Sequence, residues 1–218
     1  MSAKTALVVG ASGLVGSHCL DELLQHPAYA RIEIWGRRAL PREHPLLAQK
    51  QVDFERLEEQ TLQADEVYCC LGTTIAVAGS REAFRRVDYG YPLALARLAA
   101  AAGASAFLLV SALGANAASG VFYNRIKGEL ERDVRKLGLK RWHFFRPSLL
   151  VGARAEPRLG ERIGFALDRV IGPLMLGGMA KYRPIEAAAV ARAMVRVANS
   201  EQVSGTIESD AIAALARG

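Results

Sequence analysis

Residues Gly10 to Gly16 constrain the fold more than any other stretch, because they place three glycines at regular steps of three. They follow Lys4 to Val9, a short apolar and β-branched run that predicts a buried strand. Apolar residues at helical spacing come next, from Leu14 to Leu24, so the glycines fall in a strand-to-helix turn. Such a turn directs backbone N–H groups and the positive end of a helix dipole at one point. It therefore predicts a site for the phosphates of a nucleotide.

The spacing of this turn is G-x-x-G-x-x-G, with Ala-Ser inside it, rather than the more common G-x-G-x-x-G. That variant resembles the turn of the short-chain dehydrogenase/reductase superfamily. Glycine permits the tight turn, a close approach of the backbone to a pyrophosphate, and close packing of helix on strand. The residues expected to hold the dinucleotide here are Gly10, Ser12, Gly13, Leu14, Val15 and Gly16.

Strands and helices alternate along the remainder of the chain. The expected strands are 4–9, 31–35, 51–53, 66–71, 106–111, 142–146 and 205–208, and the expected helices include 80–102, 122–137 and 187–198. This alternation predicts an α/β fold, a doubly wound parallel-sheet Rossmann fold, with the whole of 1–218 as a single domain. The glycine-rich and apolar stretch 152–183 breaks the rhythm, and we expect it to form a small C-terminal cap on the substrate side.

Composition and charge exclude several classes of function. The net charge is +6, but the basic residues are scattered and no aromatic residues interleave with them, which argues against a nucleic-acid partner. The apolar stretch from Leu93 to Leu113 is interrupted by Arg97 and Gly103, which argues against a membrane span. The three cysteines show neither a disulfide pattern nor metal-ligand spacing. With no signal peptide in evidence, these features predict a cytoplasmic protein without a metal.

Three residues form the expected catalytic group. Ser111 ends a predicted strand, and the following helix carries Tyr123 and, one turn later on the same face, Lys127. A phenol has an unperturbed pKa of about 10, and a neighbouring ammonium favours the phenolate, which brings the tyrosine closer to the working range. The resemblance to short-chain reductases implies that Tyr123 exchanges a proton with the substrate, that Lys127 also holds the nicotinamide ribose, and that Ser111 hydrogen-bonds the substrate carbonyl.

The choice of dinucleotide depends on the end of the second predicted strand. An enzyme that prefers NAD carries an acidic residue there, whereas this chain has Arg37 and Arg38. Arginine accommodates a 2′-phosphate, so the sequence predicts NADP(H), with NAD(H) as the alternative. By resemblance, Asp53 meets the adenine amino group. Leu71, Gly72 and Thr73 line the cofactor where the fourth predicted strand ends.

Several further motifs narrow the resemblance. They are Cys-Leu-Gly-Thr-Thr at 70–74, Val-Asp-Tyr at 87–89, Phe-Tyr-Asn-Arg-Ile-Lys-Gly-Glu at 122–129 and Phe-Arg-Pro at 145–147. Together with the glycine turn they resemble the Tat-interacting-protein family, a group of atypical short-chain reductases, over nearly the whole chain. This resemblance implies NADPH binding and a loosely defined activity, but it does not identify a substrate.

The leading hypothesis is therefore an NADPH-dependent oxidoreductase that transfers hydride to a small carbonyl substrate. The apolar residues of the 152–183 cap hint at a hydrophobic pocket. The alternative is a dinucleotide-sensing or protein-interaction module, although such a module has no need of all three catalytic residues. A third hypothesis, an epimerase or dehydratase that retains its cofactor, fits Arg37 and Arg38 less well. Homodimers are common in the superfamily, but no stretch of this sequence identifies an interface.

Overall fold

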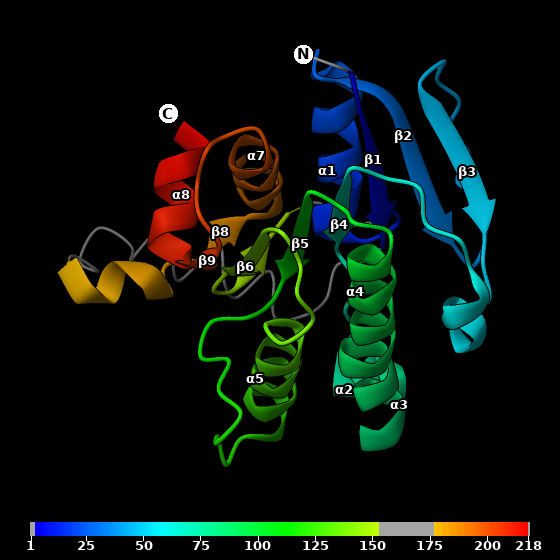
Figure 1. Cartoon of the computed structure of the whole chain (residues 1–218). Helices are drawn as coiled ribbons and strands as arrows, with labels where there is room; N and C mark the ends of the chain where they lie inside the picture. The colour runs from blue at the N-terminus through cyan, green and yellow to red at the C-terminus, as the bar shows by residue number, and fades with distance from the viewer. Residues whose placement is uncertain (1–2, 153–176, 218) are drawn as a thin grey trace.

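A seven-stranded, wholly parallel sheet forms the centre of the computed structural model, which describes residues 3–152 and 177–217 (Figure 1). The strands are β1 (Lys4–Val9), β2 (Tyr29–Gly36), β3 (Leu47–Gln51), β4 (Glu66–Cys69), β5 (Ala106–Val110), β6 (Trp142–Arg146) and β9 (Gly205–Glu208). Their order is β3-β2-β1-β4-β5-β6-β9, so the direction of winding reverses between β1 and β4. This is the doubly wound Rossmann arrangement that the sequence predicted, and ligands bind such sheets at the reversal point.

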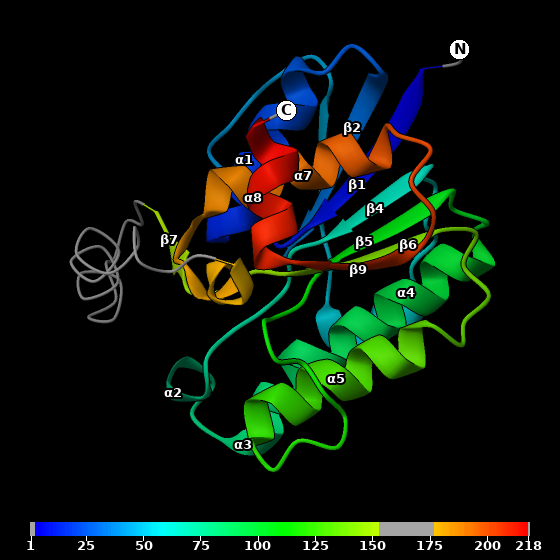
Figure 2. The ribbon, with the colours of Figure 1, turned by 90° about the vertical axis from the view of Figure 1, so that its left-hand side faces the viewer.

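Two layers of helices cover the sheet (Figure 2). One face carries α1 (Leu14–Gln25), α7 (Ala187–Ala198) and α8 (Ser209–Arg217), and the other carries α4 (Tyr91–Ala101) and α5 (Phe122–Val134). Successive strand residues point to opposite faces, so β1 sends Val8 into the first core and Val9 into the second. Both faces of β1 are apolar for this reason, as buried parallel strands require.

The long helix expected over 80–102 is present with one interruption. Ser80 accepts a hydrogen bond from the Ala83 N–H at 3.0 Å and caps α3 (Arg81–Arg85), at the position where the predicted helix begins. A π turn, η2 (Arg86–Gly90), then joins α3 to α4. Gly103, with a φ of +69°, follows the end of α4 in the left-handed conformation that glycine favours. The π turn places Asp88 in the interior, at 1% exposure.

The prediction of a third strand at 51–53 is wrong by several residues. The strand is β3, which ends where the prediction began, and it pairs only with β2 because it lies at the edge of the sheet. An edge strand buries little, so its side chains carry a weak apolar pattern. Asp53 instead caps the 3₁₀ helix η1 (Phe54–Glu59), through a 3.0 Å hydrogen bond from the Glu55 N–H.

Most of the expected cap at 152–183 lies outside the described residues. Next to it, β7 (Leu150–Val151) pairs in parallel with β8 (Ile185–Glu186) in a small second sheet that the sequence did not predict. The remaining short elements are α2 (Ile75–Ala78) and η4 (Gly177–Tyr182). Within the described ranges, no helix combines the length and the apolar character needed to cross a bilayer.

Candidate functional site

The glycine turn packs directly on the end of β4. Gly10 has a φ of +93°, and a Cβ at this position would lie 2.6 Å from the carbonyl oxygen of Cys70. A Cβ on Gly16 would lie 2.1 Å from the carbonyl oxygen of Gly10. Only glycine fits either position, and the close fit brings the first turn of α1 up to β4.

The amino end of α1 is open to a ligand. Gly13 precedes the helix without a side-chain cap, the first turn contains no acidic residue, and both Ser12 and Gly13 are exposed. Backbone N–H groups at such an end attract an anion, and the helix dipole adds to the attraction. The electrostatics at the amino end of α1 therefore favour an anion at the predicted phosphate site.

Lys127 lies beside the loop that follows β4. Its ammonium group is 2.8 Å from Oδ1 of Asp88, and Oδ2 of the same carboxylate accepts a 2.8 Å hydrogen bond from the Thr73 N–H. A Cβ on Gly72 would lie 3.5 Å from Asp88 and 3.8 Å from the Lys127 ammonium. The structure therefore brings together two residues of the predicted cofactor loop and the predicted catalytic lysine.

Burial and charge act on Lys127 in opposite directions. The residue is 3% exposed, and burial favours its neutral form. The negative charge of Asp88 and the neighbouring Tyr123 outweigh burial and raise the pKa of Lys127 to about 12. Lys127 is thus a buried cation at neutral pH. Tyr123, one helical turn earlier, is half-buried, and its ring packs against Phe84 at a centroid distance of 5.6 Å.

Ser111 belongs to a different set of contacts. Its hydroxyl donates a 2.5 Å hydrogen bond to Oε1 of Glu131, which is completely buried on α5. The guanidinium of Arg146 donates to both oxygens of Glu131, at 2.9 and 2.6 Å, and Arg135 adds a contact of 3.2 Å. At 5% exposure, Ser111 lies in this buried cluster, with its hydrogen bonded to Glu131.

The residues predicted to select the dinucleotide lie at the surface. Arg37 and Arg38 follow β2 and are exposed. Asp53, which was predicted to meet the adenine amino group, is also exposed, and its carboxylate accepts from the Glu55 N–H. Burial raises the pKa of the nearby Tyr91 to about 12, with a hydrogen bond to Glu55 acting in the same direction, and the charge of Arg37 opposes both.

Sequence reasoning assigned no role to Asp88 or to Glu131. Both are carboxylates in the core, and each holds one of the predicted catalytic residues. One signal was available: Glu131 follows Lys127 by four residues, so two opposite charges share a helical face whose neighbours Ile126 and Leu130 are apolar. Charged residues on an apolar face indicate buried partners elsewhere in the fold.

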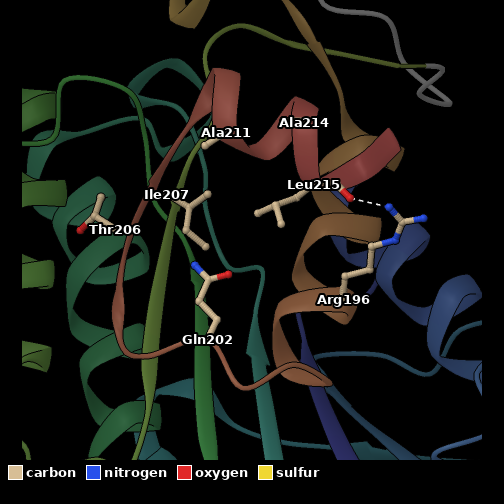
Figure 3. Close-up of a pocket in the computed structure, with 7 residues that line it drawn as sticks. All are labelled: Arg196, Gln202, Thr206, Ile207, Ala211, Ala214 and Leu215. Carbon is tan, nitrogen blue, oxygen red and sulfur yellow. Dashed lines mark hydrogen bonds between the residues drawn. The ribbon is translucent and has the colours of Figure 1, made fainter. Parts of the chain in front are cut away.

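A separate hollow of about 570 Å³ lies between β9, α7 and α8 (Figure 3). It is lined by Arg196, Gln202, Thr206, Ile207, Ala211, Ala214 and Leu215. The Arg196 guanidinium donates to the carbonyl oxygen of Leu215 across one side of it, at 2.5 Å. None of the predicted site residues lines this hollow, so the site at the glycine turn is distinct from it.

The comparison with known families agrees with this geometry. The model described as the NAD dependent epimerase/dehydratase family matches residues 6–121, slightly more than half of the chain. This chain belongs to the NAD-dependent epimerase/dehydratase family. The matched range contains the glycine turn, the loop after β4, Asp88 and Ser111, and it ends at the start of α5.

Named relatives extend the likeness. Protein HTATIP2 of Rattus norvegicus is 40% identical over 167 residues, which cover 74% of this chain and 69% of the relative. Protein FMP52, mitochondrial, of Candida albicans is 32% identical over 221 residues, which cover 95% and 93%. The predicted resemblance to the Tat-interacting-protein family is confirmed by the first of these.

Solved structures of the same fold hold nicotinamide dinucleotides. MoeE5 in complex with UDP-glucose and NAD superposes with a TM-score of 0.71 at 18% identity, over 93% of this chain and 75% of that one. Human epimerase family protein SDR39U1 (isoform 2) with NADPH gives 0.63, also at 18% identity, over 93% and 72%. At such low identity the likeness shows the fold alone. Within the epimerase/dehydratase family this fold supports a nicotinamide cofactor and an oxidoreductase type of activity.

The expected location needs a correction. The absence of a signal peptide and the reduced cysteines led to the expectation of a cytoplasmic protein. The relatives named FMP52 and fmp52, from Candida and Aspergillus species, are called mitochondrial proteins. The prediction of a purely cytoplasmic protein conflicts with those names. It was wrong because free cysteines and the lack of a recognisable secretory signal do not distinguish the cytoplasm from mitochondria.

Proposed function

We propose that this chain is an NADPH-dependent oxidoreductase of the short-chain type, which transfers hydride to a small carbonyl substrate. The position of Lys127 is the observation that supports this most. A lysine that is charged, buried and ion-paired, and that lies against the Gly72–Thr73 loop one turn from a tyrosine, has the placement that proton transfer beside a cofactor needs.

The residues around the glycine turn fit a dinucleotide. Gly10 and Gly16 let the turn and the first turn of α1 pack closely on the end of β4, where any Cβ would clash with backbone, and the open end of α1 supplies N–H donors. The Gly72–Thr73 loop and Lys127 are suited to the nicotinamide ribose. Arg37 and Arg38 are suited to a 2′-phosphate, which is why we propose NADPH over NADH.

When bound, the dinucleotide supplies a hydride to the carbonyl carbon of the substrate. Tyr123 donates its phenolic proton to the carbonyl oxygen as negative charge develops there, and the phenolate later regains a proton from solvent. The Lys127 cation stabilises that phenolate and so makes the phenol a better acid. Ser111 assists by hydrogen-bonding the carbonyl oxygen, provided that its hydrogen leaves Glu131.

One observation favours a second candidate, a dinucleotide-sensing or protein-interaction module with little or no turnover. The Ser111 hydroxyl is already bonded to a buried carboxylate, which a residue with a purely structural role would also show.

The family also includes epimerases, and MoeE5 binds a UDP-sugar, so sugar nucleotides belong in any substrate screen.

Fluorescence titration and a substrate panel test the proposal together. Energy transfer from tryptophan to bound NADPH measures affinity, and we expect NADPH to bind at least about tenfold more tightly than NADH. Absorbance at the nicotinamide band then follows turnover on aldehydes, ketones and UDP-sugars. We expect carbonyl turnover by the wild type and a loss of about 10² or more in kcat for Tyr123→Phe.

A matched variant distinguishes chemistry from general damage. Tyr89→Phe removes another phenolic hydroxyl, whose hydrogen bond to Asp133 joins α5 to the π turn, and it should retain turnover. If NADPH binds while no compound on the panel is reduced, the sensing module becomes the better explanation. If NADPH does not bind, or if NADH binds more tightly, the proposal fails.

A further inference from the structure

A single buried carboxylate connects the cofactor loop to the predicted catalytic lysine. Asp88 is 1% exposed, and its two oxygens make different contacts, one with the Lys127 ammonium and one with the Thr73 N–H, each at 2.8 Å. The contacts therefore join three segments that are far apart in sequence: the loop after β4, the π turn η2 and the helix α5.

The π turn is the local reason for this position. A π turn is rare and widens the helix by one residue, and such turns occur often at functional sites. Here the turn lies between α3 and α4 and carries Asp88 in its middle, flanked by the half-buried Val87 and Tyr89. A regular helix over the same residues would present a different side to Lys127, since one residue of rotation is about 100°.

The charges at this point nearly balance. A lysine inside a protein loses its proton unless an opposite charge compensates the loss of hydration, and a buried carboxylate has the converse requirement. The titratable groups that face Lys127 are Asp88 from η2, Tyr123 from its own helix and Cys69 from β4. Burial raises the pKa of the Cys69 thiol to about 12, so the thiol stays neutral, and Asp88 is the group that forms an ion pair with the Lys127 ammonium.

We propose that Asp88 is a positioning residue, which keeps Lys127 charged and holds it against the Gly72–Thr73 loop so that Lys127 can act on both the cofactor ribose and Tyr123. This inference rests on the proposed function. Asp88 is almost completely buried and has almost no surface left for a substrate. It therefore affects the reaction only by holding Lys127 in place and keeping it charged.

Asp88→Asn is the direct test, because asparagine keeps the shape and an acceptor for the Thr73 N–H but removes the negative charge. We expect NADPH affinity to fall at least about tenfold. We also expect the alkaline limb of the kcat profile for reduction to move up by about one pH unit, since a neutral Lys127 no longer favours the Tyr123 phenolate. Unchanged affinity together with an unmoved or lowered limb would overturn the proposal.

A measurement without cofactor separates this inference from the proposed function. The chain has six lysines, so ¹³C labelling of their Cε atoms gives a resolvable spectrum, and Lys127→Met assigns the Lys127 signal. We expect Lys127 to remain charged at pH 8 in the wild type and to be largely neutral at that pH in Asp88→Asn. A charged Lys127 in the variant contradicts the inference, even if the wild type fails to bind NADPH.

Two further variants keep the test decisive. In Asp88→Asn/Lys127→Met both charges are removed, which avoids an uncompensated buried ion, and the loss of NADPH affinity should equal that of Lys127→Met alone. Additive losses would mean that Asp88 acts independently of Lys127. The matched control is Glu66→Gln, which removes a buried carboxylate from Lys4 (2.7 Å) at the amino end of β4 and should leave NADPH affinity unchanged.

Discussion

Ser111 donates its hydroxyl hydrogen to Glu131 over 2.5 Å, so one of the predicted catalytic residues is held by a carboxylate in the core. Arg146 fixes that carboxylate through two hydrogen bonds. A substrate carbonyl would have to compete for the Ser111 hydrogen with a charged acceptor, and charge-assisted hydrogen bonds are the stronger ones. Within the described residues the Tyr123 hydroxyl has no hydrogen bond to a carboxylate, so we expect Tyr123 to contribute more to the rate than Ser111.

The catalytic variants should therefore differ in size of effect. We predict that Tyr123→Phe lowers kcat by about 10² or more, while Ser111→Ala lowers it by about tenfold. The measurement is the steady-state rate on one carbonyl substrate at saturating NADPH, with circular dichroism as a check on folding. A loss for Ser111→Ala as large as that for Tyr123→Phe would show that the hydroxyl leaves Glu131 in the reacting complex.

The glycine turn gives a prediction about both stability and binding. In Gly16→Ala the new methyl group would meet the carbonyl oxygen of Gly10 at 2.1 Å, and the backbone on both sides is fixed by packing. We expect the free energy of unfolding to fall by about 1–3 kcal/mol and NADPH affinity to fall more than about tenfold. Thermal melting and fluorescence titration measure the two effects.

Gly120→Ala is the control for this substitution. A Cβ at Gly120 would have no heavy atom within 4 Å, and the residue lies in the exposed loop before α5. It should melt and bind like the wild type. Equal losses in Gly16→Ala and Gly120→Ala would mean that the fit of the glycine turn has no special importance.

The sequence predicted the fold well where residues bury a regular apolar face. The limits of β6, α7 and β9 agree with the expected ranges to the residue, because alternation and helical spacing are strong there. The prediction was wrong for β3, since an edge strand buries little and leaves a weak pattern. It also missed the π turn at Arg86–Gly90, because the residues on either side continue the same helical spacing.

The candidate site, like the fold, was predicted from the sequence only in part. Lys127 and the Gly72–Thr73 loop meet in space, as expected from the order of elements along a parallel sheet. The partners Asp88 and Glu131 were not assigned, because a carboxylate reads as a surface residue until a basic partner from another element is placed beside it. Local spacing shows which residues share a helix face, but pairing across elements depends on how the helices pack.

His143 gives a prediction about stability against pH. Its side chain is completely buried on β6, and neither ring nitrogen has a hydrogen-bond partner within the described part of the chain. Burial, with a smaller effect from Arg141, lowers the pKa of His143 from 6.5 to about 4. Between these values the unfolded chain binds a proton that the folded chain excludes, so stability falls as pH drops from 6.5 to 4, by up to about 3 kcal/mol.

Urea denaturation at several pH values measures this effect. His143→Leu should lose less stability than the wild type over that interval, because the residue that takes up the proton on unfolding is gone. His44→Gln, at an exposed position before β3, controls for the removal of a histidine. Parallel pH profiles for the wild type and His143→Leu would rule out His143 as the source.

Arg37 and Arg38 give the test of cofactor choice. Both are exposed after β2, and an arginine there can form charge-assisted hydrogen bonds to a 2′-phosphate that NADH lacks. We predict that Arg37→Ala/Arg38→Ala weakens NADPH binding by about tenfold or more and changes NADH binding by less than about twofold. Fluorescence titrations with the two dinucleotides measure this, and added salt should weaken NADPH binding more in the wild type than in the variant.

Arg31→Ala is the control, because Arg31 is exposed near the amino end of the same strand, paired with Glu33. If both dinucleotides lose affinity equally in the double variant, the arginines contribute general attraction for anions, and the preference for NADPH must come from elsewhere.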